Sequence, residues 1–134
     1  MKLKVILVAC LAFFSMNAMA AVSADVESII SGSSLNALQK KSLNQYAESL
    51  DAILNADITN RDVVINTNKQ FMNAQQCLAQ IYSIDQKPDM MRVSRNIFNT
   101  TFKEKNDLNK YYRFLGQAQQ EGDLALPNSA KACL

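Results

Sequence analysis

The stretch TNRDVVINTNKQFMNAQQCLAQIY, residues 59–82, decides the fold class of this chain. Its apolar side chains recur three or four residues apart, which places them on one face of a helix. That face contains Val64, Thr67, Phe71, Ala74, Leu78 and Ile81. Thr59 and Asp62 have the spacing of a capping box, so we expect this helix to begin at Thr59 and to end near Ser83.

Two helices are predicted before this stretch. The first is short, from about Ala24 to Ser31, and Gly32 should end it in a left-handed C-cap. Ser33 or Ser34 can then cap a second helix that runs to about Asn55. The apolar stripe of this second helix contains Leu35, Leu38, Leu43, Tyr46, Ala47, Leu50, Ile53 and Leu54.

Two further helices are predicted after it. Pro88 fits the first turn of a helix, and an apolar stripe follows through Met90, Val93, Ile97, Phe98 and Phe102. The stripe is interrupted at residues 103–106, where we expect a break before a last helix from Asp107 to about Gln119. Its inner face should contain Leu108, Tyr111, Tyr112 and Leu115. The sequence therefore predicts an all-α fold, a small helical bundle of about four main helices plus a short N-terminal helix.

The N-terminal residues 1–20 have the pattern of a secretory signal peptide. Lys2 and Lys4 form a basic start, residues 5–14 are apolar, and Ala18-Met19-Ala20 is a small-x-small cleavage site. The apolar run is too short for a membrane span. We therefore expect an exported protein that begins at Ala21, in the periplasm of a Gram-negative cell.

An alternative interpretation makes residues 7–10 a lipoprotein cleavage box with Cys10 as the lipid anchor, but few apolar residues precede it. Without Lys2 and Lys4 the chain has 12 basic and 12 acidic side chains, so no global attraction to nucleic acid or to acidic membranes follows. Residues 21–134 are enough for one helical domain with one core.

Two cysteines remain after removal of the signal peptide, Cys77 and Cys133. In an exported protein, two cysteines predict a disulfide, which would pin the C-terminal tail to the central helix. A catalytic redox pair is the alternative, but such pairs are usually C-x-x-C at a helix start, and these two are far apart.

The residues expected of an enzyme or a metal site are scarce. The chain has no His and only three Gly, which removes the commonest general base and the glycine-rich nucleotide loops. Glu48 and Asp51 could form a pair of glycosidase carboxylates, but acids at the polar edge of a helix are ordinarily solvated. Met72, Met90 and Met91 could suggest a copper(I) site, but they are ordinary core residues. We expect no enzyme, no cofactor and no metal.

Charge is unevenly distributed along the chain. Residues 21–91 have five basic and eight acidic side chains, a balance of −3, and residues 92–134 have seven and four, a balance of +3. At helical spacing a polar stripe is predicted from Arg92, Arg95, Asn99, Lys103, Lys110 and Arg113. This stripe is either a binding face for an anionic ligand or an ordinary solvated face. No nucleic-acid-binding motif is present, and no nucleic-acid partner is expected.

Amides are the other unusual feature of the polar surface. Residues 21–134 contain 12 Asn and 10 Gln, several of them on the central helix. Uncharged amides cost less to desolvate than charges, and interface cores are depleted in Lys and Glu. We therefore expect binding to another protein, most specifically as an immunity or inhibitor protein against a toxin that targets the cell wall. The alternatives are an envelope ligand-binding or chaperone-like protein that uses the basic face, and a small cell-wall hydrolase.

Overall fold

The computed structural model describes residues 22–81 and 87–121, which form five α-helices and no β-strand. In chain order the helices are α2 (Ala24–Ser31), α3 (Ala37–Leu54), α4 (Arg61–Ile81), α5 (Lys87–Thr101) and α6 (Lys105–Gln120). The predicted all-α bundle of about four main helices and a short N-terminal one is confirmed for these residues. The predicted signal peptide, the helix end near Ser83 and the tail with Cys133 lie outside them.

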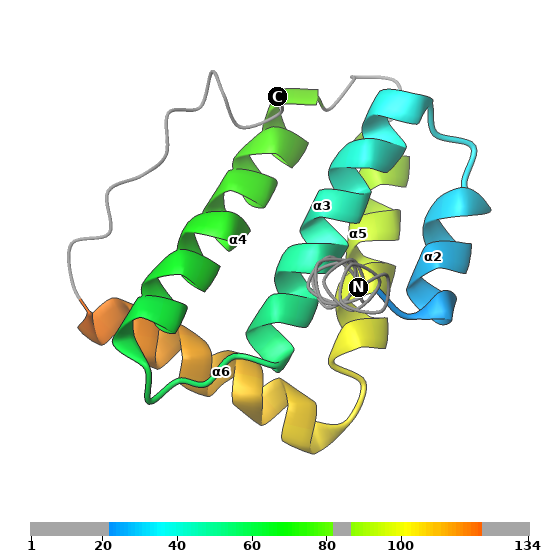
Figure 1. Ribbon diagram of the computed structural model, residues 1–134. Helices are drawn as coiled ribbons and strands as arrows, with labels where there is room; N and C mark the ends of the chain where they lie inside the picture. The colour runs from blue at the N-terminus through cyan, green and yellow to red at the C-terminus, as the bar shows by residue number, and fades with distance from the viewer. Residues whose placement is uncertain (1–21, 82–86, 122–134) are drawn as a thin grey trace, which may run out of the picture.

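Four helices stand side by side and alternate in direction along the chain (Figure 1). In the view of Figure 1, α2 and α4 run upward, α3 and α5 run downward, and α6 crosses the lower end of the bundle. The short turn between α3 and α4 makes them an antiparallel hairpin. The fold is an up-down-up-down arrangement with one helix across its end.

Helix α3, not α4, is the centre of the bundle. It packs against all four of the other helices, whereas α4 packs mainly against α3 and α6. Small side chains permit this on α3, where Ser42, Ala47 and Ser49 are buried. The buried hydroxyls are satisfied locally, because Ser42 Oγ donates to the Gln39 carbonyl at 2.8 Å and Ser49 Oγ donates to the Tyr46 carbonyl at 2.7 Å.

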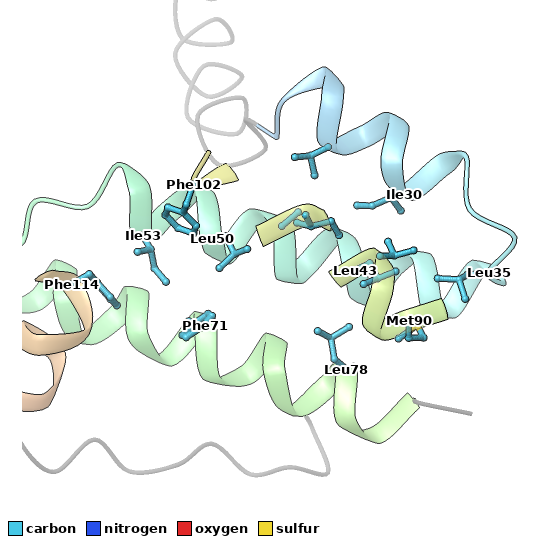
Figure 2. Close-up of a cluster of buried hydrophobic side chains, with 14 of the residues drawn as sticks. Ile30, Leu35, Leu43, Leu50, Ile53, Phe71, Leu78, Met90, Phe102 and Phe114 are labelled. Atoms are coloured by element: carbon cyan, nitrogen blue, oxygen red, sulfur yellow. The ribbon is translucent and has the colours of Figure 1, made fainter. Parts of the chain in front are cut away.

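The core runs the length of α3 on the sides that face α4 and α5 (Figure 2). Figure 2 shows Leu43, Leu50 and Ile53 of α3 among side chains from every other helix. Several of these core side chains are fully buried, among them Ile30, Leu43, Leu50, Ile53, Met90 and Phe114. A fully buried Leu or Ile contributes about 1.5–3 kcal/mol before the entropy of ordering it, so this cluster stabilises the bundle.

The apolar face predicted for residues 59–82 is confirmed on α4, but the predicted cap of this helix is wrong. Five of its six predicted residues are buried and Ile81 is partly buried. The capping side chain is Asn60, whose Oδ1 accepts from the backbone N–H of Asp62 and of Val63. Thr59 does not cap the helix: its hydroxyl and its N–H both donate to Asp57 Oδ1, at 2.6 and 3.0 Å.

Helix α2 has the predicted bounds, but Gly32 has φ −79°, so the expected left-handed cap is wrong. A Cβ at Gly32 would lie 2.9 Å from the Ser28 carbonyl oxygen, which is why the smallest residue fits there. Neither predicted serine caps α3. Asn36 and Gln39 form a reciprocal capping box instead, and Ser33 Oγ donates to the Ile30 carbonyl.

The predicted break is present, at residues 102–104, and α6 begins two residues earlier than expected. Its buried face is centred on Phe114 and Ala118, and Tyr112, predicted on the inner face, is 60% exposed. Tyr112 lies roughly 100° round the helix from Tyr111, which turns it to solvent. Leu38, predicted in the stripe of the second helix, lies in the first turn of α3 and is 54% exposed.

Candidate functional site

The predicted basic stripe is divided between two helices. All six of its predicted residues are exposed. Arg92, Arg95 and Asn99 lie on α5, but the break at residues 102–104 sends α6 across the end of the bundle. Lys110 and Arg113 of α6 therefore lie on a different helix axis. Arg92 is also partly neutralised, since its Nη1 lies 2.9 Å from Asp89 Oδ1.

Lys110 and Arg113 line a groove between α6 and the turn that joins α3 to α4. We call it the basic groove, and its other lining residues are Ile53, Leu54, Asn55, Ala56 and Ile58. Its volume is about 320 Å³. Among the described residues, neither cation makes an ion pair or a side-chain hydrogen bond. The groove thus combines several apolar side chains with two positive charges that have no partner among the described residues.

Lys103 belongs to a second, smaller groove at the junction of α2, α3 and the end of α5. It contains two carboxylates, Asp25 and Asp51, and its volume is about 160 Å³. Burial raises the pKa of Asp51, and a side-chain hydrogen bond with Asn55 partly opposes this. We call it the acidic groove.

The acidic groove tests the glycosidase interpretation of Glu48 and Asp51. Burial also raises the pKa of Glu48, so neither acid is fully solvated as the helical wheel suggested. Glu48, however, does not line the groove that contains Asp51. A volume of about 160 Å³ is also below the roughly 300–1,000 Å³ usual for ligand sites. The arrangement is a poor fit to a glycan substrate held between two carboxylates.

The outward side of α4 is nearly free of charge. From Val63 to Ile81 the only charged residue is Lys69. The exposed and partly exposed amide side chains of this helix are named the amide surface. They are Asn66, Gln70, Asn73, Gln75, Gln76 and Gln80. Two shallow depressions adjoin along it and share Gln75 and Ala79. One is completed by Met72 and Gln76, and the other reaches Tyr46 of α3 and Ser94 of α5.

The predicted cysteine and two of the predicted methionines are buried or bonded within the fold. Cys77 is buried on the core side of α4, and its predicted partner Cys133 lies outside the described residues. Met90 is fully buried in the core, and Met72 Sδ accepts a hydrogen bond from Asn68 Nδ2 at 3.3 Å. Within residues 22–81 and 87–121 no three His, Cys, Asp or Glu side chains gather as a metal site would require.

No signal in the sequence indicated the basic groove as a unit. Lys110 and Arg113 were predicted as part of a stripe, but Ile53–Ile58 are more than 50 positions earlier and were assigned to a helix end and a turn. Only the crossing of α6 over that turn brings them together. In contrast, the amide content of α4 is visible directly in the sequence.

The scan against protein-family models gives no match, and neither the curated proteins nor the solved structures contain a significant match to this chain. In the part of the chain that the structure describes, no helix has the length and hydrophobicity to cross a membrane.

Proposed function

We propose that this protein acts by binding another protein through the amide surface of α4. The observation that supports the proposal is the single charge between Val63 and Ile81 on a helix whose outward side is exposed. Desolvating amides costs less than desolvating Lys or Glu, and the centres of protein interfaces are depleted in those charged residues. The two adjoining depressions offer places for side chains of a partner.

The most specific form of the proposal is an immunity or inhibitor protein that neutralises a cell-wall-targeting toxin in the periplasm. Its support is the signal-peptide pattern of residues 1–20, the small helical domain and the uncharged surface. Intact-mass measurement of the exported protein should give a chain that begins at Ala21. A lipid adduct on Cys10 would instead establish the lipoprotein alternative.

The same proposal includes a disulfide between Cys77 and Cys133. Export to an oxidising compartment and the absence of any other cysteine after removal of residues 1–20 support it. Cys77 is 2% exposed on the core side of α4, a position that suits a structural bond better than a reactive thiol. This bond would hold the C-terminal tail against the central part of the bundle.

Site-specific photo-crosslinking in the native host tests the binding surface. A crosslinking amino acid at Gln75 should give one discrete adduct with a second protein. The matched control is Asn99, an exposed amide on α5 outside the amide surface. Adding Ala79→Glu should abolish the adduct at position 75, because Ala79 lines both depressions with Gln75 and the new charge would have to be desolvated. Equal adducts from positions 75 and 99, or none from either, would contradict the proposal.

A ligand-binding or chaperone-like envelope protein is the second candidate, and the basic groove is the observation that favours it. A cell-wall hydrolase has less support, since the acidic groove is small and contains only one of the two predicted carboxylates. Incubation with purified peptidoglycan tests that third candidate: release of soluble fragments that is lost in Asp51→Asn would favour it over binding alone.

A further inference from the structure

We propose that the basic groove binds an aliphatic carboxylate, with the carboxylate between Lys110 and Arg113 and the chain along the apolar wall. This site is separate from the amide surface and does not depend on the protein-binding proposal. It lies where α6 crosses the turn between α3 and α4, at the end of the bundle (Figure 1).

The apolar part of the groove wall is small and suits a short aliphatic chain. Leu54, Ala56 and Ile58 are partly buried and pack against the core, and Ile53 beneath them is 1% exposed. The only uncharged polar residue in the lining is Asn55. A volume of about 320 Å³ is at the lower end of the roughly 300–1,000 Å³ usual for small-molecule sites. The groove therefore fits a short chain rather than a large ring system.

The two cations suit a carboxylate. Lys110 and Arg113 are three residues apart on one helix, so their side chains are neighbours and can converge on one anion. The planar guanidinium of Arg113 can donate two parallel hydrogen bonds to a carboxylate, and the Lys110 ammonium adds a point charge. No carboxylate lines the groove to compete with a ligand.

Two acids on α6 could compete for these cations. Asp107 lies one turn before Lys110, but it makes no ion pair among the described residues. Glu121, at the end of the helix, has partners of its own. Glu121 Oε1 lies 3.0 Å from Arg61 Nε, and Gln117 Nε2 donates to Glu121 Oε2 at 3.3 Å. That ion pair joins the start of α4 to the end of α6, so Glu121 does not pair with Lys110 or Arg113. Their charges are therefore free to bind an external anion.

The alternative is that these cations only stabilise the negative C-terminal end of α3. Two of the terminal carbonyls of α3, those of Asp51 and Ile53, have other donors. Asn55 N and Nδ2 both donate to the Asp51 carbonyl, at 3.1 and 2.9 Å, and Ala56 N donates to the Ile53 carbonyl. Neither the Lys110 nor the Arg113 side chain donates to a carbonyl among the described residues. Capping of α3 thus does not use the two cations.

Titration with octanoate, followed by backbone amide shifts in NMR, tests the proposal on the exported protein. Octanoate should bind saturably and shift amides in residues 53–58 and 110–113. Lys110→Gln and Arg113→Gln should each weaken binding about tenfold, the loss expected for one charge-assisted hydrogen bond. Ile58→Ser should weaken it about fivefold through the lost apolar contact. All three variants are at partly or fully exposed positions, and their urea midpoints check folding.

Matched controls separate this site from nonspecific attraction. Arg95→Gln and Lys105→Gln remove exposed cations that do not line the groove, and octanoate affinity should stay unchanged. Octanol lacks the anion, octyltrimethylammonium reverses the charge and acetate lacks the chain, so all three should bind at least about tenfold more weakly. Equal binding of any of them, equal loss in the control variants or no saturable binding of octanoate would overturn the proposal.

Discussion

The ring of Tyr111 stands edge-on to the ring of Phe98, with centroids 4.9 Å apart and planes at 86°. The same ring meets Phe71 of α4 edge-on at 6.4 Å, and Phe102 at 5.1 Å. Helix α4 packs closely on α3 and α6, and α5 on α3 and α2. Tyr111 therefore links α4 to α5 from a third helix at the end of the bundle.

Removal of this link should be costly. Tyr111→Ala should lower the free energy of unfolding by about 2–4 kcal/mol, because it removes a partly buried aromatic side chain and its ring contacts. Tyr112→Ala is the matched control: this neighbouring ring is 60% exposed, and we expect a loss below about 1 kcal/mol. Urea unfolding measures both, and equal losses would show that Tyr111 is not the link.

The cap of α4 can be assigned by mutation. Asn60→Ala should cost about 1 kcal/mol, since its side chain accepts from two otherwise unpaired N–H groups at the start of the helix. Thr59→Ala should cost less, because its hydroxyl binds only the exposed Asp57. Urea midpoints of the two variants decide between them, and a larger loss in Thr59→Ala would restore Thr59 as the capping residue.

Gly116 and Gly32 should respond to an added side chain in opposite directions. Gly116→Ala should raise the free energy of unfolding by about 0.5–1 kcal/mol, since an added Cβ meets nothing within 4 Å and alanine is the better helix former. Gly32→Ala should lower it, because the new Cβ would lie 2.9 Å from the Ser28 carbonyl oxygen. Thermal unfolding of both variants checks this, and destabilisation by Gly116→Ala would contradict it.

The proposed disulfide should contribute a large part of the stability. A bond from Cys77 to Cys133 closes a loop of about 57 residues, so reduction or Cys133→Ser should cost roughly 2–5 kcal/mol. Amide hydrogen exchange should become faster in residues 123–134 first, because few apolar side chains in that segment could anchor it without the disulfide. Mass spectrometry of the oxidised chain should show the loss of two hydrogens, and two free thiols in protein from the periplasm would refute the bond.

Asp51 should destabilise the folded protein at neutral pH. Burial raises its pKa above the ordinary 3.8, so the folded state binds the proton more tightly than the unfolded state and loses stability as pH rises through this window. Asp51→Asn should therefore have a higher urea midpoint than the parent at pH 7, with the difference vanishing below about pH 3.8. Asp25 and Lys103 line the same groove as Asp51, so both must stay unmutated for the pH dependence to be assigned to Asp51.

The opposite sign is expected at Asp57. Hydrogen bonds from the Thr59 hydroxyl and N–H hold its pKa below 3.8, so its contribution is present above that pH and disappears as pH falls through the lowered value. Asp57→Ala should lower the midpoint at pH 7. If Asp51→Asn and Asp57→Ala moved the urea midpoint at pH 7 in the same direction, the opposite pKa shifts of the two carboxyls would not govern their effects on stability.

Much of the local structure was predictable. The apolar faces of α4 and α5 and the break after Thr101 follow from spacing, and Pro88 lies in the first turn as expected. The caps were harder, because neighbouring residues compete. Asn36 and Asn60 have side chains that reach two or three residues ahead, and they replaced the serines and the threonine that the pattern favoured.

By itself, the sequence determined the helices, their approximate bounds and the all-α class, because caps and apolar periodicity involve residues within about four positions of one another. Only the tertiary structure decided that α3 is central, that α6 crosses the end of the bundle and that Lys110 and Arg113 meet the turn at Ile58. Such pairings, like the ion pair of Arg61 with Glu121 across 60 positions, depend on which apolar faces bury one another. No short-range pattern in the chain encodes that choice, because many helix arrangements bury similar apolar area.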